Sequence, residues 1–408
     1  METHQTQLLN IVRYQLFGGD KPQTDDEQLH AILKEANEQT VFTMVFPFLR
    51  NTIIKVSPDH FSKNNELFLG NVMTNTANFL EHNELHALMN KHGIPYSAIK
   101  GLASAYYYPE ASLRDMGDVD FLVNEAYFEK AKSAVQSIGF TVDHGDSEDS
   151  LHIAFNRKPR SIWEQHRSVN GIPDNKAGEL IKAETDKIIE TSVTVTLDGA
   201  TCRIPDAFHH GLIMLLHMIS HMTSEGIGLR HLCDWAVFAN QLENDEFSDL
   251  FEKKLKSFGL WRFAQIMTLV SIRYLGIDEK EWAHNEQIDE AQLENVITDI
   301  LSGGNFGKKD LNRYREIKYI SNRGESTVDK KHIVLQAFDT LNHKVYSDYK
   351  WIEKRKLLLP IGWVAEGGKY AGLLISGQRK SKNTSVMLRE AAKRKDIYSK
   401  MNLFEADN

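Results

Sequence analysis

One block of short strand-like segments interrupts a chain whose apolar residues otherwise follow helical spacing. Apolar residues recur every three or four positions through residues 1–92 and again after residue 205, and this spacing is typical of one face of a helix. Residues 93–204 instead carry short apolar runs separated by glycine and polar turns, which indicate strands. Only nine of 408 residues are proline, so long helices are permitted. The pattern predicts an α+β fold with a small mixed sheet between helical regions.

Four segments are expected along the chain. They are an N-terminal helical region (1–92), a mixed module (93–204), a second helical domain (205–358) and a Gly-rich segment that ends in a basic helix (359–408). In the first segment, Thr24 and Glu27 have capping-box spacing before a helix over 25–37.

Finer patterns predict individual elements. Strands are expected at 94–99, 118–123, 140–143, 151–156 and 161–169, with a hairpin over 191–204 that turns at Asp198-Gly199. Helices are expected at 5–17, 40–90, 102–108, 125–138, 206–222, 229–242, 246–276, 285–302, 331–358 and 384–400.

Composition excludes several classes of protein. The hydrophobic fraction is 41% and the charged fraction 25%, which are ordinary values for a globular chain and argue against disorder. A net charge of −8 disfavours a DNA-coating protein, and no DNA partner is expected. Two cysteines cannot form a disulfide framework. The start of the chain does not resemble a secretory signal, and no run of 18 uncharged apolar residues occurs. A cytoplasmic protein without a membrane partner is expected.

Asp118 and Asp120 are the most informative residues. On a strand, alternate side chains share a face, so the two carboxylates point the same way while Val119 and Phe121 point to the other, apolar face. Adjacent carboxylates repel unless a cation lies between them. Mg²⁺ prefers oxygen ligands together with substrate phosphates. The alternative is an exposed strand with no metal.

The run KGLASAYYYPEASLRDMGDVDFLV, residues 100–123, resembles the signature of polymerase-beta-type nucleotidyltransferases, in a bacterial branch of uncharacterised nucleotidyltransferases. The shared elements are Lys100-Gly101, a short helix ending in Tyr108-Pro109, and Arg114 followed by Gly117-Asp118-Val119-Asp120. The resemblance extends over residues 93–170 and more weakly over 205–240.

The resemblance implies a catalytic site that moves a nucleoside monophosphate from an NTP to an acceptor hydroxyl. It implies that Asp118, Asp120 and a later carboxylate, Glu164 in Glu164-Gln165-His166, hold two Mg²⁺ ions, with Mn²⁺ as an alternative. Phosphates would be bound by Lys100, Gly101, Ser104, Arg114 and Gly117. The Gly-Ser of better-known superfamily members is missing, and Lys100, Ser104 or the backbone of residues 101–104 would replace it.

The second helical domain carries further candidates. His217 and His221 share a helix face and could bind zinc, face the substrate or pack in the core. Arg230 and Asp234 have the spacing of a helix ion pair, whereas the resemblance implies that they shape the nucleotide cleft.

The sequence is compatible with several classes of acceptor. Residues 371–400 hold eight Lys or Arg against two acidic residues, so this tail could meet RNA or another anionic acceptor or could be a solvated helix face. The alternatives are a sugar or other metabolite, an RNA or a protein as acceptor, or a nucleotide-binding module without catalysis.

Overall fold

The computed structural model describes residues 1–143, 152–159, 161–309, 363 and 384–405. The chain divides into two compact units, one formed by Met1–Tyr314 with Ile397–Asn408 and the other by Arg315–Asp396. The stretch between the helices predicted at 285–302 and 331–358 lies mostly outside the described residues. The predicted helix at 331–358 lies wholly outside them, as does nearly all of the Gly-rich segment at 359–383. The second unit is therefore represented here by residue 363 and by part of the C-terminal helix.

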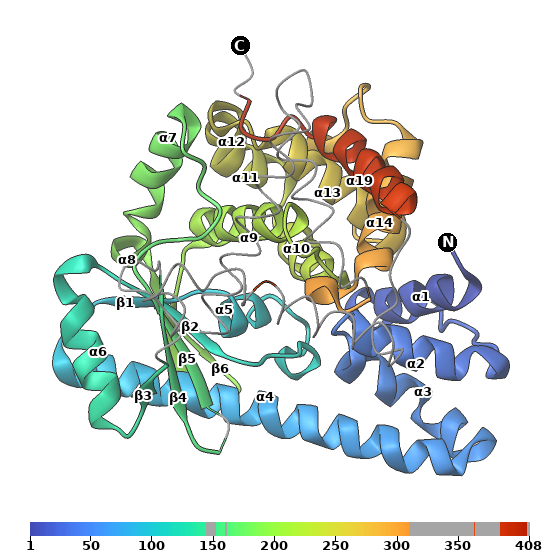
Figure 1. Ribbon diagram of the computed structural model, residues 1–408, viewed down its shortest axis with the longest axis horizontal. Coiled ribbons are helices and arrows are strands. Elements are labelled where there is room, and N and C mark those ends of the chain that lie inside the picture. Colours follow the sequence, from blue (N-terminus) through green and yellow to red (C-terminus); the bar gives the residue numbers. More distant parts are fainter. Residues whose placement is uncertain (144–151, 160, 310–362, 364–383, 406–408) are drawn as a thin grey trace. The chain divides into compact units, whose positions relative to one another are not determined.

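The helices, in chain order, are α1 (Thr3–Phe17), α2 (Leu29–Glu38), α3 (Phe42–Val56), α4 (Pro58–His92), α5 (Gly101–Ala105), α6 (Phe128–Ser137), α7 (Lys176–Thr185), α8 (Ile188–Thr191), α9 (Ala207–Met222), α10 (Leu229–Gln241), α11 (Asn244–Phe247), α12 (Lys253–Phe258), α13 (Trp261–Leu275), α14 (Glu290–Gly303) and α19 (Thr384–Ser399). The strands are β1 (Tyr96–Ala98), β2 (Val119–Val123), β3 (Thr141–Val142), β4 (His152–Arg157), β5 (Ser161–His166), β6 (Val193–Leu197) and β7 (Ala200–Ile204). The predicted α+β class is confirmed (Figure 1).

A five-stranded mixed sheet forms the centre of the first unit, in the order β1-β2-β5-β4-β3. β2 and β5 are parallel neighbours, and the other pairs are antiparallel. The parallel register sets Asp120 opposite Glu164 and Leu122 opposite His166. The separate hairpin β6–β7 turns at Asp198-Gly199, where both residues have positive φ, as the predicted turn requires.

The two faces of β2 meet different cores. Val119, Phe121 and Val123 join a cluster with residues of α4 and α6, and in Figure 1 α4 passes along this side of the sheet. Leu122 joins the larger helical core instead. Because side chains alternate along a strand, Asp120 points with Leu122, away from the apolar sheet core. The predicted alternation is thus confirmed.

Several element boundaries differ from the predictions. The helix expected over 40–90 is broken at Ser57, where Pro58 begins α4 at a position that needs no backbone N–H. The helix expected over 246–276 is broken by Gly259, which adopts a left-handed conformation and ends α12. Thr24 does not cap the second helix, because the Asp25 side chain accepts the hydrogen bond from Glu27 N–H.

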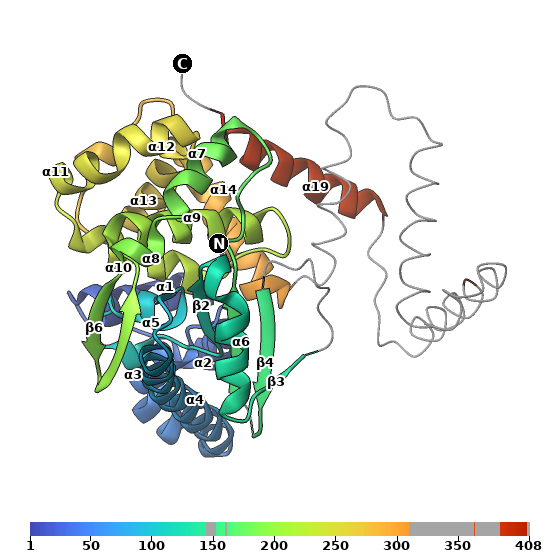
Figure 2. The ribbon, with the colours of Figure 1, turned by 90° about the vertical axis from the view of Figure 1, so that its left-hand side faces the viewer.

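The N-terminal helices pack directly on the second helical region. Residues of α1, α2 and α3 share one buried cluster with residues of α9, α10, α13 and α14, and Figure 2 shows α9, α13 and α14 above the strands of the sheet. Gln39, after α2, accepts a hydrogen bond from Leu229 N–H at the start of α10, 3.0 Å away. Cys202 and Cys233 are buried and unpaired. Among the described helices, none is long and apolar enough to cross a bilayer.

Candidate active site

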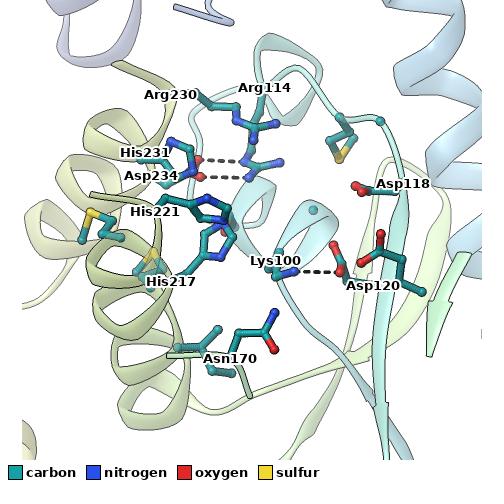
Figure 3. A pocket seen from close by; sticks show the side chains of 18 of the residues that line it. Lys100, Arg114, Asp118, Asp120, Asn170, His217, His221, Arg230, His231 and Asp234 are labelled. Carbon is teal, nitrogen blue, oxygen red and sulfur yellow. Dashed lines mark hydrogen bonds and ion pairs between the residues drawn. The ribbon is translucent and has the colours of Figure 1, made fainter. Parts of the chain in front are cut away.

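A cavity of about 360 Å³ lies between the sheet and helices α9 and α10. Its sheet side is lined by Asp118, Asp120 and Glu164, and its helical side by histidines and Arg230 (Figure 3). Every candidate site residue of the sequence analysis lines this cavity except His166, which lies behind Asp120. The cavity therefore brings together candidate residues that are spread from position 100 to position 234 of the chain.

The carboxylates reach the cavity from two neighbouring strands. Asp118 immediately precedes β2, Asp120 lies within it, and Glu164 lies opposite Asp120 on β5. Burial, together with the charges of Asp120 and Glu164, raises the pKa of the Asp118 carboxyl from 3.8 to about 6. A cation bound beside Asp118 would offset both the burial and the repulsion from the neighbouring carboxylates.

Asp120 is the best-compensated of the three carboxylates. It is 2% exposed, and its Oδ1 accepts hydrogen bonds from Lys100 Nζ and His166 Nε2, each at 2.8 Å. Burial alone would raise the pKa of Asp120, but Lys100 and His166 outweigh it and hold that pKa well below its ordinary range. Lys100 thus provides the positive charge beside Asp120 in this structure.

His166 shares a potential ligand set with these carboxylates. Atoms of Asp120, Glu164 and His166 lie within 4.8 Å of one another, the one such group of three among the residues that the structure describes. Asp118 lies in the same cavity but outside this group. Burial lowers the pKa of His166, but hydrogen bonds to Asp120 and Glu164 outweigh it and raise that pKa.

Lys100 adopts an unusual backbone conformation. Its φ is 61° and its ψ is −145°, a region that costs energy for any residue with a Cβ and that occurs mainly at functional sites. Gly101, which follows with φ of 34°, starts the short helix α5. Gly101 and Ser104 both line the cavity. The N–H of Ser104 donates to Lys100 O within α5, so this group is already used.

Arg114 and Asp234 form a buried bidentate ion pair. Arg114 Nε and Nη2 donate to the two carboxylate oxygens of Asp234 at 2.7 and 2.8 Å, and Tyr108 Oη donates to the same carboxylate at 2.8 Å. The helix ion pair between Arg230 and Asp234 does not form, because Asp234 is taken by Arg114. The guanidinium group of Arg114 likewise already donates to Asp234. Binding of phosphate by Arg114 therefore stays a prediction.

Arg230 lacks a carboxylate partner among the described residues. Its Nη1 donates to Asp115 O at 3.2 Å, while its buried Nε has no hydrogen-bond partner in the described parts of the chain. Burial, then the nearby Arg114 charge, lowers the pKa of Arg230. Arg230 is therefore a cation that faces the cavity and is available to an anionic ligand.

Sequence reasoning missed the polar residues of α4 that support the loop before β2. Asn75 accepts from Met116 N–H at 2.9 Å, and Asn78 Nδ2 donates to Asp118 O at 2.7 Å. One turn later, His82 donates to Asn78 O at 2.8 Å and lies beneath Gly101. The signal that could have found them is their spacing of three and four, which places polar residues on the otherwise buried face of α4.

His217 and His221 are joined on the cavity wall by His231 of α10. The ring centroids of His217 and His221 are 4.4 Å apart, and those of His217 and His231 are 5.3 Å apart. These three do not form a cluster in which one nitrogen from each lies within 4.8 Å of the others. The arrangement therefore does not favour a zinc site at these histidines.

Carboxylates presented by neighbouring strands to a cavity that also holds basic side chains suit the binding of cations and phosphates. The family described as "Uncharacterised nucleotidyltransferase" matches residues 25–276, more than half of the chain. The chain belongs to this family, and the resemblance found in the sequence is confirmed.

The comparison with solved structures gives a remote match. The chain is similar to the crystal structure of an antigenic nucleotidyltransferase-like protein from Paracoccidioides brasiliensis, with 11% sequence identity and a TM-score of 0.31. The match covers 51% of this chain and 94% of that one. No curated protein matches the chain.

Proposed function

We propose that the chain is a divalent-metal-dependent nucleotidyltransferase that moves a nucleoside monophosphate from an NTP to an acceptor hydroxyl and releases pyrophosphate. One observation supports this above the others. Asp118, Asp120 and Glu164 line one side of a cavity whose other side carries the unpaired Arg230 cation. An anionic substrate bridged to carboxylates by cations would satisfy both sides.

The carboxylate set fits hard divalent cations. Asp118, Asp120 and Glu164 offer oxygen ligands, which suit Mg²⁺ and Mn²⁺, and burial together with the neighbouring carboxylates raises the pKa of Asp118. We propose that these three hold two ions, with His166 adjoining Asp120 and Glu164. Bound ions would polarise the transferred phosphoryl group and acidify the attacking hydroxyl.

The remaining cavity residues have roles set by their positions. Lys100 and Arg230 would bind phosphate oxygens, with Gly101, Ser104 and Gly117 lining the path of the phosphates. When nucleotide enters the cavity, the ammonium group of Lys100 would leave Asp120 and bind a phosphate oxygen instead. Arg114 and Asp234, which hold each other, would position the loop that carries Asp118.

The proposed transfer is a single displacement at the α-phosphorus of the NTP. The acceptor oxygen forms a bond to the α-phosphorus, and the bond from that phosphorus to the bridging oxygen breaks. Pyrophosphate leaves with the electron pair of the broken bond. Glu164, whose side chain is 25% exposed, would accept the proton from the hydroxyl.

We propose two classes of acceptor. A sugar or other metabolite would enter the cavity directly, whereas RNA or protein would also use the basic tail, most of which lies outside the described residues. The cytoplasmic location also stays a prediction.

The test is metal-dependent chemistry by the full chain. Purified protein with Mg²⁺ or Mn²⁺ is given each of the four NTPs labelled at the α-phosphate, together with pools of metabolites, RNA or protein. We expect pyrophosphate release and transfer of label to one pool, and loss of both in Asp120→Asn. Asp186→Asn, at an exposed i,i+4 surface pair, is the matched control.

Two outcomes would overturn the proposal. One is equal pyrophosphate release by the wild type and Asp120→Asn. The other is nucleotide binding by the wild type without transfer of label to any pool, which would instead support a binding module.

A further inference from the structure

Four histidines line the side of the cavity that faces the carboxylates, and we call them the histidine wall: His210, His217 and His221 of α9, and His231 of α10. Steps of seven and four residues along α9 keep its three side chains on one face. Figure 3 shows His217, His221 and His231 across the cavity from Asp118 and Asp120, with Lys100 between the two sides.

The histidine wall has unusually many unsatisfied polar atoms. His210 and His231 are 1% and 3% exposed, yet neither ring nitrogen of His210 has a hydrogen-bond partner among the described residues, and the His231 imidazole has only a weak interaction with the Gly228 backbone. The buried Nδ1 of His221 is also without a partner in that part of the chain. Buried polar groups are almost always hydrogen-bonded, since leaving one unpaired is costly. Imidazole nitrogens gathered in this way on one cavity wall are open to a ligand that donates and accepts hydrogen bonds.

The imidazoles are neutral near pH 7. Burial, the largest cause, lowers the pKa of His221 to about 4 and that of His210 to about 3, and it lowers the pKa values of His217 and His231 as well. The charged groups that face them, Lys100 and Arg230, lower three of these pKa values further. Neutral imidazole offers one donor and one acceptor, so the wall matches an uncharged group that carries both.

Apolar side chains complete this side of the cavity. Met214 and Met218 lie on α9 among the histidines, and Phe306, 40% exposed, lies 4.7 Å from the His221 ring, measured between centroids. A planar ring can stack on Phe306 while its edge meets imidazole nitrogens. Phosphate would be held next to this subsite by Lys100 and by Arg230, whose guanidinium carbon lies 5.8 Å from the centroid of the Phe306 ring.

We propose that the histidine wall and Phe306 form the subsite for the nucleobase of the NTP and read the base through uncharged donors and acceptors. This inference rests on the proposed function, because it assumes that the cavity binds a nucleotide. It places the base against α9 and α10 and directs the phosphates toward Lys100 and the carboxylates.

The test separates base binding from phosphate binding. Isothermal titration calorimetry with Mg²⁺ measures the affinity of the full chain for α,β-methylene NTP analogues and for inorganic tripolyphosphate. His231→Phe keeps an aromatic ring and removes both nitrogens. We expect it to lower the affinity for the preferred NTP analogue about tenfold. Tripolyphosphate affinity should change less than about twofold. His284→Phe, at an exposed histidine outside the cavity, should change neither.

A second measurement uses the wild type, in case His231→Phe does not fold. Imidazole ¹⁵N resonances of the labelled protein should shift when the matching nucleoside is added and stay in place with tripolyphosphate. Equal weakening of both ligands by His231→Phe, or no effect on either, would overturn the proposal. So would nucleoside that moves no imidazole resonance. If base binding is found without nucleotidyl transfer, the proposed function fails while the subsite stands, and no nucleotide binding by the wild type refutes both.

Discussion

At the scale of single residues, Lys100 lies between the carboxylates on one side of the cavity and the histidines on the other (Figure 3). Its ammonium group lies 2.8 Å from Asp120 Oδ1, where a metal ligand is proposed, and its backbone is held at positive φ. Burial would lower the pKa of Lys100, but the attraction of Asp120 outweighs burial and raises it. A fixed cation at this position competes with a metal ion for the same carboxylate.

This competition predicts the effect of Lys100→Met on metal affinity. Removing the ammonium group leaves Asp120 with His166 as its remaining partner, so Mn²⁺ should bind roughly tenfold more tightly in the absence of nucleotide. Titration followed by the electron paramagnetic resonance of free Mn²⁺ gives the affinity directly. The control is Lys182→Met, at an exposed surface pair. Weaker Mn²⁺ binding by Lys100→Met would show that Lys100 does not compete with the metal.

At the scale of elements, the segment from Tyr108 to Asp118 is held from three directions. Asp234 of α10 binds Tyr108 and Arg114, Asn78 of α4 binds Asp118 O, and Thr43 at the start of α3 donates to the Asp115 carboxylate. The position of Asp118 therefore depends on two consecutive helices before the sheet, α3 and α4, and on α10 after it.

The ion pair between Arg114 and Asp234 predicts a large loss of stability in Asp234→Asn. The change leaves the buried Arg114 charge without its counterion, and breaking a buried pair in this way costs about 3–5 kcal/mol. Urea unfolding followed by circular dichroism measures the loss. Asp186→Asn, at the surface pair with Lys182, should cost less than about 1 kcal/mol, and a similar cost for the two variants would contradict this assignment.

The support from α4 predicts that Asn78→Ala impairs the site without unfolding the chain. The change leaves Asp118 O unpaired at a cost of about 1–3 kcal/mol, and Asp118 loses its fixed position. Metal affinity and pyrophosphate release should both fall. Asn64→Ala, on an exposed part of the same helix, tests whether any loss is specific, since it should leave both measurements unchanged.

The sequence predicted those features that local pattern determines. Alternation along 118–123 predicted which way Asp120 points, and Asp198-Gly199 predicted the hairpin turn. The pairing of Arg114 with Asp234 was not predicted, although both residues were singled out, because 120 residues separate them. Asn75 and Asn78 were missed although their spacing marks a polar stripe on α4, because their partners are backbone atoms of a distant loop.

At the scale of the whole molecule, buried histidines make folding sensitive to acid. Burial lowers the pKa of His82 to about 4 and similarly affects the four members of the histidine wall. The unfolded chain, with pKa values near 6.5, binds protons that the folded chain excludes. Stability is therefore complete above about pH 6.5 and is lost as the pH falls toward 4. Asp118 and His166, whose pKa values are raised, act in the opposite direction.

We predict that the free energy of unfolding decreases by up to about 2 kcal/mol per buried histidine between pH 7 and pH 5. Urea unfolding of the metal-free protein at several pH values measures the slope. His82→Asn should reduce the slope by close to one proton, whereas the surface variant His284→Gln should not. A slope that is unaffected by His82→Asn would mean that His82 is not neutral in the folded chain.

The hydrogen bond from Leu229 N–H to Gln39 Oε1 has an evolutionary consequence. Together with the contacts of Thr43, Asn78 and Asp234, it makes the cavity depend on sequence both before and after the sheet. A genetic crossover near residue 93 or 204 would join the strands that carry the carboxylates to helices that did not evolve with them. We therefore expect these strands to be inherited together with the helices on either side.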